Sequence, residues 1–310
     1  MTIRVTNSQQ MGQVMSDINK NLRLLQELQL QISTGKRINQ PSDDPIGVVK
    51  SVGLKSGIAA TEQHQSNISD GTARLNAAIL ALSSTSDLLL EIEGLSADVV
   101  NNLTPQTSAM RPIVITEINQ MINEIFINAN AKYLGKYLFG GHESLTRPYI
   151  EATDAYGNIT GVSRNVRGID DPIMHTVAEG IGIQINVSGS MPFMPNGEGG
   201  QNDIFDSVLR LRDALTSGDM GAASDALDDL RDEFENINVA IAIAGNRLQQ
   251  METTESNNEE LSIFKQMNLS DILDVDMARA IIDLNYQNYI LQCSLEVGAK
   301  IIAPSLLDFI

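Results

Sequence analysis

Apolar residues recur every three or four positions near the start of the chain. In residues 10–33 they stand at Met11, Met15, Ile18, Leu22, Leu25 and Ile32. This spacing places them on one face of an α-helix. Gly35 follows directly, and Pro41 and Pro45 bracket a polar connector. The pattern therefore predicts a first helix that ends before Gly35.

A second helical pattern covers about residues 57–103. Its apolar face carries Leu75, Ile79, Leu82, Leu89, Ile92 and Val99. Thr104 and Pro105 interrupt the pattern, since proline lacks the amide hydrogen that an inner turn needs. The helical pattern resumes over about residues 108–131. We therefore expect two further helices, separated by a break at this proline.

Residues 135–202 have a different character. Glycines and prolines cluster there, and residues 181–187 alternate apolar with polar or small side chains, which is typical of strands joined by turns. Residues 191–202 have the composition of a loop. We expect a small β-rich insert that faces outward and that the helices do not need for their own pairing.

The C-terminal half returns to a helical pattern. Its seam steps by three and four residues through Leu227, Leu230, Phe234, Ile237, Ile241, Ala244, Leu248 and Met251. The seam fails at Glu255 and Asn258. A final helix is expected after Ser270, whose hydroxyl would cap it. The seam of that helix would carry Met277, Ile281, Leu284, Leu291, Leu295 and Ile302.

The order helix–insert–helix predicts a mainly α fold. We expect an elongated rod of long antiparallel helices, formed by N- and C-terminal arms, with the small β-rich insert domain at the far end. The expected parts are an N-terminal assembly helix with its connector in residues 1–45, arms of the helical rod domain in residues 46–144 and 203–269, the insert in residues 145–202, and a C-terminal assembly helix in residues 270–310.

The two terminal helices carry more apolar surface than one partner helix can cover. Residues off the seams include Val14, Leu24, Leu28 and Leu30 in the first helix, and Ile282, Tyr286, Tyr289, Ile290, Val297 and Ile301 in the last. A helix that is apolar on several faces is buried among several neighbours. This favours self-assembly over a larger bundle within one chain. The predicted assembly seam consists of Ile18, Leu22, Leu25, Ile32, Leu284, Leu291 and Leu295.

Charge and composition narrow the function classes. The formal net charge is −18 and the pI is about 4.4, which argues against binding to nucleic acid or to anionic membranes. Residues 1–60 have a balance of +3, so the remaining residues sum to −21. Opposite charges could favour contacts between copies, although a solvated face is an equally good interpretation. Cys293 is the single cysteine, which excludes an intrachain disulfide, and we interpret it as a packing residue.

Targeting and membrane signals are weak. The first ten residues show no apolar core or small-residue cleavage site of a secretory signal peptide, and we found no apolar run of the length that a membrane span needs. By these signals alone the protein would be cytoplasmic.

A search for catalytic, cofactor-binding or metal-binding residues gives no candidate. His64, His142 and His175 are far apart, without a second ligand at helical or hairpin spacing. The glycines at 180–182 and 197–200 lack the residues that follow in phosphate-binding loops. The acidic run of residues 228–233 is typical of a solvated helix face, and the pair Asp43 and Asp44 is typical of a cap or turn.

Four stretches resemble the bacterial flagellin family. Ser33-Thr-Gly-Lys-Arg-Ile-Asn39, followed by Asp43-Asp44, is similar to its N-terminal signature, and residues 276–310 with Ser305-Leu-Leu307 resemble its C-terminal helix. Tyr133-Leu-Gly-Lys-Tyr-Leu-Phe-Gly-Gly141 and Gly245-Asn-Arg-Leu-Gln-Gln-Met-Glu252 are similar to the arms of its junction member. The matched motif positions are Gly35, Arg37, Asn39, Asp43, Asp44, Leu138, Phe139 and Gly140. The resemblance does not cover the insert, and Asn288 departs from an apolar seam.

This resemblance implies a structural subunit of the bacterial flagellum that joins hook to filament. It implies copies arranged in a helical ring between the first hook-associated protein and flagellin. It also implies a flagellar export chaperone as partner, and an extracellular location reached through type III export without a cleaved signal peptide. This revises the cytoplasmic expectation.

Two alternatives remain open at this point. A short filament flagellin would share the terminal motifs but would form the bulk of the filament. An intracellular coiled-coil scaffold would share the helical seams, although it would not need the terminal signatures. An enzyme in the insert is disfavoured, since its residues offer no paired nucleophile and base.

Overall fold

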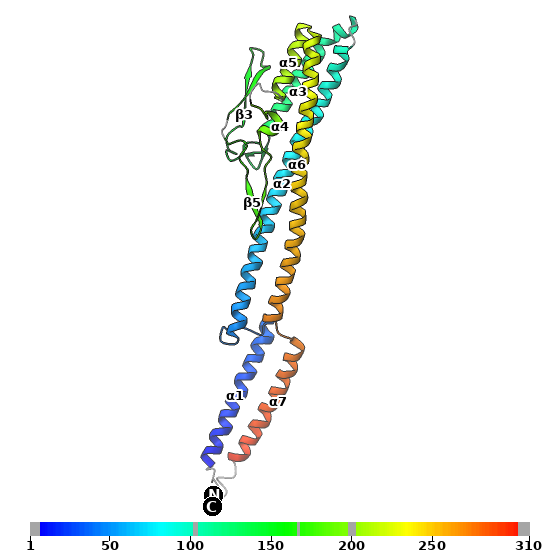
Figure 1. Cartoon of the computed structure of the whole chain (residues 1–310). Helices are drawn as coiled ribbons and strands as arrows, with labels where there is room; N and C mark the ends of the chain where they lie inside the picture. Colours follow the sequence, from blue (N-terminus) through cyan, green and yellow to red (C-terminus); the bar gives the residue numbers. More distant parts are fainter. Residues whose placement is uncertain (1–6, 102–104, 166–167, 198–202, 303–310) are drawn as a thin grey trace, which may run out of the picture. The chain divides into compact units, whose positions relative to one another are not determined.

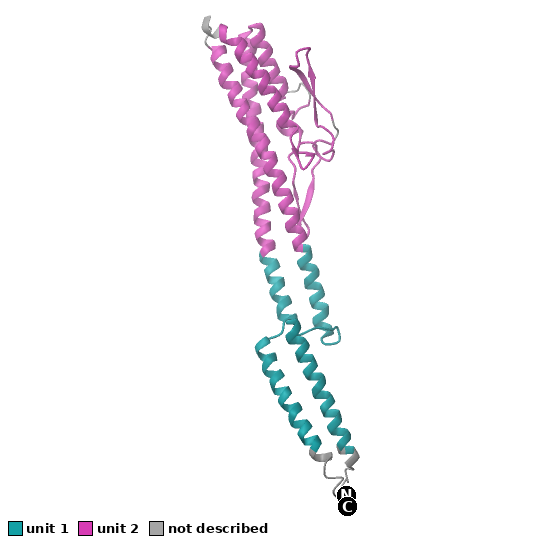
Figure 2. Ribbon diagram, turned by 180° about the vertical axis from the view of Figure 1, so that it is seen from behind, with its two compact units in different colours: residues 1–60, 260–310 teal, residues 61–259 magenta. Residues whose placement is uncertain are grey.

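The computed structural model describes residues 7–101, 105–165, 168–197 and 203–302. The chain divides into two compact units, which Figure 2 shows in different colours. Unit 1 consists of Met1–Ala60 and Glu260–Ile310, and unit 2 consists of Thr61–Glu259. The break expected at Thr104 and the motif at residues 305–307 lie outside the described residues.

Long helices dominate both units, which confirms the mainly α prediction (Figure 1). The helices are α1 (Asn7–Thr34), α2 (Pro45–Asn101), α3 (Pro105–Ala129), α4 (Ser190–Phe193), α5 (Ile204–Ser217), α6 (Met220–Leu273) and α7 (Met277–Ile302). Each of α2 and α6 contributes residues to both units. The second helix was expected from about residue 57, but α2 begins earlier, at Pro45.

Local chemistry explains where several helices begin and end. Asp203 precedes α5 and accepts hydrogen bonds from the N–H groups of Phe205 and Asp206, while Gly218 ends that helix at φ 82°. The expected cap at Ser270 is wrong, because α6 continues through Ser270 to Leu273. Asp276 caps α7 instead, accepting a bond of 3.1 Å from the N–H of Arg279.

The strands form three separate antiparallel hairpins. They pair β1 (Lys132–Tyr133) with β2 (Lys136–Tyr137), β3 (Tyr149–Thr153) with β4 (Ile159–Arg164), and β5 (Met174–Ala178) with β6 (Ile181–Gln184). A two-stranded hairpin is marginal alone in water, so each needs support from a packed neighbour. Residues 191–193, which we expected in a loop, belong to α4 instead, in which Ser190, Pro192 and Phe193 are buried.

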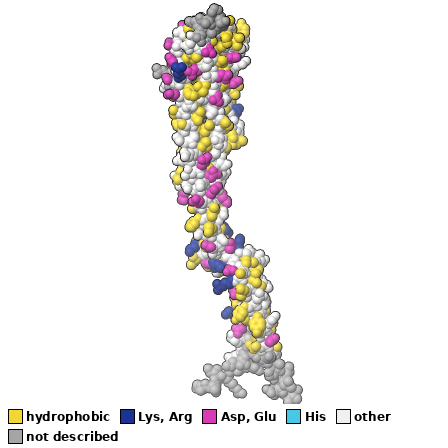
Figure 3. Space-filling view, turned by 90° about the vertical axis from the view of Figure 1, so that its right-hand side faces the viewer, with side chains coloured by type: hydrophobic (Ala, Val, Ile, Leu, Met, Phe, Trp, Pro, Cys, Tyr) yellow, Lys and Arg dark blue, Asp and Glu magenta, His cyan; other side chains and the backbone are white. Residues whose placement is uncertain are grey.

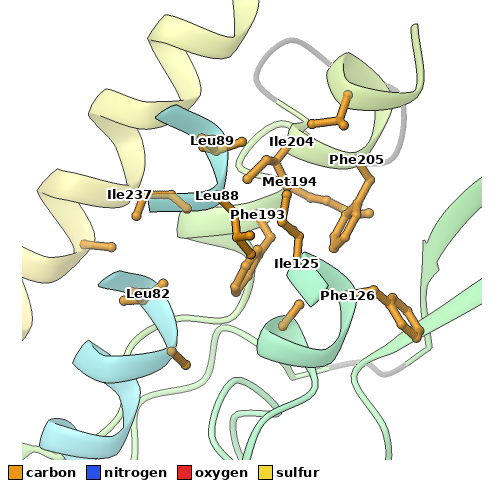
Figure 4. Close-up of a cluster of buried hydrophobic side chains, with 14 of the residues drawn as sticks. Leu82, Leu88, Leu89, Ile125, Phe126, Phe193, Met194, Ile204, Phe205 and Ile237 are labelled. Atoms are coloured by element: carbon orange, nitrogen blue, oxygen red, sulfur yellow. The ribbon is translucent and has the colours of Figure 1, made fainter. Parts of the chain in front are cut away.

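One hydrophobic cluster fills unit 2, and part of it is drawn in Figure 4. It joins residues of α2 such as Leu82 and Leu89 to Ile125 of α3, Phe205 of α5 and Ile237 of α6. Phe193 is fully buried within it, with its ring centroid 5.1 Å from that of Phe139 and 5.6 Å from that of Tyr149. Residues from the strand-containing region are therefore part of the main core.

The strands of unit 2 lie beside its helices: β4 packs against α5 and α3, and β5 lies along α2 (Figure 1). Two amide side chains hold β5: Nδ2 of Asn67 donates to the carbonyl of Thr176 at 2.8 Å, and Nδ2 of Asn258 donates to that of Val177 at 2.8 Å. Nη1 of Arg247 donates to the carbonyl of Asn186 at 2.6 Å. The insert is thus hydrogen-bonded to the helices.

Among the described residues, α2 alone is long and apolar enough by length and composition to cross a membrane. Half of its apolar window is buried in the protein itself. This corrects our expectation that no stretch reaches that length, and a buried core helix has the same composition.

Candidate assembly surface

The terminal helices α1 and α7 pack against each other in antiparallel directions within unit 1. Nδ2 of Asn21 donates to Oγ of Ser294 at 3.3 Å. Nearer the C-terminal end of α7, Gly298 is buried, and a Cβ there would lie 3.2 Å from Cγ1 of Val14. The small residue lets the two helices approach closely at that point.

The pairing covers the predicted seam only in part. Leu25 is buried, while Ile18, Ile32, Leu284 and Leu291 are half-buried. Two other seam residues remain largely in solvent: Leu22 is 40% exposed and Leu295 is 51% exposed. One helix partner therefore leaves much of the seam uncovered.

The excess apolar surface of unit 1 is extensive. The only hydrophobic side chains buried in the described part of this unit are Leu25, Ile38, Leu273 and Ala280. Large exposed hydrophobic residues on α1 and α7 are Met11, Met15, Leu22, Leu24, Leu30, Met277, Ile281, Ile282, Tyr286, Tyr289, Leu295 and Val297. Hydrophobic side chains reach the surface among the charged ones on the face in Figure 3. Such surface marks a site of association.

A groove of about 340 Å³ opens between the two terminal helices. Val14 and Asp17 line it from α1, and Tyr286, Tyr289, Ile290, Cys293, Ser294 and Val297 line it from α7. Its walls are mostly aromatic and aliphatic, with Asp17 as the one charged lining residue. A groove of this kind suits an apolar side chain better than a charged ligand.

The motif Ser33–Asn39 covers the end of α1 and the first part of the connector to α2. Gly35 ends α1 with φ 69°, in the left-handed region that glycine adopts without a steric penalty. Its carbonyl accepts from the N–H of Val275 at 3.0 Å, and the N–H of Arg37 donates to the carbonyl of Leu273 at 2.7 Å. Nη2 of Arg37 also donates to the carbonyl of Ile272 at 2.9 Å. The connector is thereby bonded to the break between α6 and α7.

The two aspartates of the motif have different structural roles. Oδ2 of Asp43 accepts from the N–H groups of Asn39 at 2.9 Å and Gln40 at 2.8 Å, which closes the turn. Asp44 caps α2, accepting from the N–H of Gly47 at 2.8 Å. This N–H bond, with Arg37 at 3.3 Å, holds the pKa of Asp44 below its ordinary value. The pair is a turn and a cap, as its sequence indicated.

The other motif residues lie in unit 2. Leu138 and Phe139 are buried in the main core, and Gly140 is buried as well. Nη2 of Arg74, a buried side chain of α2, donates to the carbonyl of Tyr137 at 3.1 Å. These residues anchor the first hairpin to α2. Their role is packing within the subunit.

The structure brings no catalytic or metal-binding group together among the described residues. No group of three or more His, Cys, Asp or Glu side chains could hold a metal ion there. The acidic run of α6 is paired in part, since Arg210 contacts Asp229 at 2.8 Å and Arg231 contacts Asp228 at 3.2 Å. Asp228 and Asp232 are exposed, as expected for a solvated face.

Glu233 is the exception in that run, and the sequence reasoning missed it. Its side chain is 1% exposed, and Oε1 accepts from Oγ of Ser207 at 2.6 Å. Burial raises its pKa to about 8, and the charges of Asp203 and Asp229 act in the same direction. Its position between Leu230 and Ile237, on the seam side of α6, could have indicated from the sequence that it is buried.

The chain resembles known flagellar proteins over most of its length. Residues 5–144 match the family model of the bacterial flagellin N-terminal helical region. Flagellar hook-associated protein 3 of Escherichia coli K12 is 24% identical over 277 residues, covering 85% of this chain and 86% of that protein. Its counterpart in Salmonella typhimurium LT2 is 23% identical over 305 residues, covering 94% and 95%. A flagellar filament 30.7 kDa core protein of Treponema maltophilum is 26% identical over 276 residues, covering 87% and 86%.

Solved structures share the fold. A flagellar hook-associated protein from Vibrio parahaemolyticus has a TM-score of 0.62 at 22% identity, covering 75% of this chain and 100% of that one. The flagellar junction protein of Legionella pneumophila has a TM-score of 0.57 at 16% identity, covering 72% and 99%. The chain is therefore similar to the bacterial flagellin family in residues 5–144, and over nearly its whole length it resembles flagellar hook-associated protein 3.

Proposed function

We propose that this chain is a structural subunit of the bacterial flagellum that forms the junction between hook and filament. The observation that carries the proposal is its similarity to hook-associated protein 3 over 94% of its length. The exposed apolar surface of α1 and α7 supplies a physical reason for assembly, since solvent exposure of so many large hydrophobic side chains is unfavourable.

In this proposal the terminal helices hold the copies together. We assign assembly to residues 1–45 and 270–310, and subunit stability to the helical arms in residues 46–144 and 203–269 with the insert in residues 145–202. The seam residues that one partner helix leaves open, such as Leu22 and Leu295, would be covered by neighbouring copies in a helical ring. The first hook-associated protein would lie on one side of the ring and flagellin on the other.

Export and location follow from the same proposal. The subunit would be extracellular, delivered by the flagellar type III apparatus without a cleaved signal peptide. A flagellar export chaperone would cover the apolar C-terminal helix before export. The role would be structural and not enzymatic, as the names of the relatives suggest.

A short filament flagellin is the alternative within the class, and the Treponema filament protein keeps it in view. The junction is favoured because the match to hook-associated protein 3 of Salmonella typhimurium covers 94% of this chain, whereas the match to the Treponema filament protein covers 87%. Abundance separates the two: a junction subunit is a trace component of sheared filaments, whereas a filament subunit is the bulk. An intracellular coiled-coil scaffold would be absent from sheared filaments.

A deletion strain tests the proposal directly. We expect hooks without filaments by electron microscopy, loss of motility, and flagellin released into the medium. The intact gene supplied in trans should restore filaments. A deletion strain with filaments of normal number and length would contradict the proposal.

A further inference from the structure

In one stretch of unit 1 the buried side chains are small or polar, and large apolar side chains are exposed to solvent. Here α2 and α6 run side by side over residues 46–60 and 260–272, and Nζ of Lys265 donates to the carbonyl of Gly57 at 3.0 Å. The buried residues of this stretch are Gly47, Ser51 and Ser262, none of them a large apolar side chain. In this stretch the two helices therefore leave no large apolar side chain fully buried.

Large apolar side chains point to solvent instead, in two patches. The α2 patch consists of Ile46, Val49 and Val52, which are 71%, 73% and 60% exposed. The α6 patch consists of Ile263, Phe264 and Met267, which are 57%, 62% and 63% exposed. Their spacing places each set on one face of its helix. Aromatic residues and methionine are enriched in protein–protein interfaces, so the α6 patch has the composition of such an interface.

The surroundings of the two patches are complementary. Glu260 and Asp271 stand four residues from Phe264 and from Met267 on the face of the α6 patch, and both are exposed. Lys50 stands four residues after Ile46, beside the α2 patch. Lys50 and Asp271 border one hollow, but among the described residues Lys50 makes no ion pair. The acidic rim of one patch thus matches the basic flank of the other.

Space for an inserted side chain also exists. A hollow of about 560 Å³ opens beside the α2 patch, with Val52 in its wall. Its other apolar lining residues are Ile38, Pro41, Val48 and Leu273, and Lys36 and Lys55 also line it. The hollow is therefore apolar in part and basic at its edge, which fits an aromatic residue on an acidic helix.

We propose that the α6 patch of one copy docks on the α2 patch of the next copy, with Phe264 entering the hollow beside Val52. The inference rests on the proposed function, and it places a second contact beyond the terminal helices. The occupant is a second copy because both patches lie in the same unit as the exposed apolar surface of α1 and α7 and have opposite charges at their edges. A contact between two different patches is heterologous, so it propagates from copy to copy.

Crosslinking in assembled flagella tests this pairing. Cys293→Ser first removes the single cysteine, and Val49→Cys and Phe264→Cys are then introduced together or singly. Both positions are exposed in the free subunit, so the substitutions should leave its melting temperature unchanged. After treatment with a short bismaleimide, the double variant should give a ladder of multimers on a denaturing gel. Each single variant should give only monomer.

The control replaces Phe264→Cys by Gln266→Cys, an exposed position off the α6 patch. It should give no ladder with Val49→Cys. Dimers from a single variant would show that a patch meets itself, which overturns the heterologous contact. Motile cells whose junction contains the double variant without a ladder would overturn the inference and leave the proposed function standing. Absence of the protein from sheared flagella would instead contradict the proposed function.

Discussion

Units 1 and 2 share two long helices, yet they bury very different surfaces. In unit 2, α2 and α6 cover one continuous cluster together with α3, α5 and the strand-containing region. In the described part of unit 1 the buried hydrophobic side chains are limited to Leu25, Ile38, Leu273 and Ala280. The same type of helix therefore serves a folded core in one unit and an open surface in the other.

This difference indicates where the free subunit is stable. Each fully buried aliphatic side chain contributes about 1.5–3 kcal/mol, so unit 2 has many such contributions and unit 1 has few. Helices that lack tertiary packing are marginal in water. We infer that unit 2 folds as the stable part of the monomer, while α1 and α7 depend on neighbouring copies for most of their stability.

The largest effect is expected in the core of unit 2. Ile237 is 0% exposed, so Ile237→Asp buries an unpaired carboxylate and should lower the free energy of unfolding by more than about 4 kcal/mol. Urea denaturation followed by circular dichroism measures it. Val239→Asp, at a position 49% exposed on the same helix, is the matched control. Equal losses for the two variants would contradict a core at Ile237.

The next effect tests whether the strand-containing region belongs to that core. Phe193 contacts Phe139 and Tyr149, so Phe193→Ala should destabilise the subunit by about 3–5 kcal/mol. Tyr156→Ala serves as control, since Tyr156 is 92% exposed. If Phe193→Ala lowers the free energy of unfolding by less than about 1 kcal/mol, as a surface substitution does, the insert is not part of the core.

A smaller effect depends on pH. The pKa of Glu233 is raised to about 8 from an unfolded value of 4.5, so the folded state holds this proton more tightly. The associated stability is fully present below pH 4.5 and is lost as the pH rises through 8. Glu233→Gln should therefore be the more stable form at pH 8, by on the order of 2 kcal/mol, and this advantage should fade toward pH 5. An advantage independent of pH would contradict the buried, protonated carboxyl group.

The smallest effect concerns the connector of unit 1. Arg37→Ala removes the side-chain bond to the carbonyl of Ile272, at a position where the side chain is 48% exposed. We expect a local loss of about 1 kcal/mol, seen as faster hydrogen exchange near the end of α6. The melting temperature of unit 2 should stay constant. Lys20→Ala, an exposed change on α1, is the control and should leave hydrogen exchange near the end of α6 unaltered. If Lys20→Ala increases that exchange as much as Arg37→Ala does, the effect is not specific to the bond between Arg37 and Ile272.

The regular seams could be predicted from the sequence, because periodicity reports a buried face directly. Along α6 the residues Leu227, Leu230, Ile237, Ala244 and Met251 are all buried, as their spacing indicated. The end of α1 before Gly35 was predicted correctly for a similar reason, since glycine tolerates the positive φ found there. Local rules suffice where one residue type satisfies one geometric demand.

Long-range bonds account for what the sequence did not reveal. Asn258 reads as a failure of the seam, yet its side chain is buried and bonded to the carbonyl of Val177, far away in the sequence. Ser270 has the right chemistry for a cap, but α6 continues past it and Asp276 takes the role. The exchanged polar and apolar faces of residues 46–60 and 260–272 were also missed, since a seam can be assigned to a partner only once both helices are placed.

One comparison tests the central claim most directly: the melting temperature and the assembly of a Leu291→Asp subunit. Leu291 is half-buried on α7, whereas Ile237 is fully buried in unit 2. We predict that the free Leu291→Asp subunit melts within about 2 °C of the parent, because unit 2 sets the transition. The same variant should be absent from the junction of sheared flagella. If Leu291→Asp lowers the melting temperature of the free subunit as much as Ile237→Asp does, α7 belongs to the monomeric core and the account is wrong.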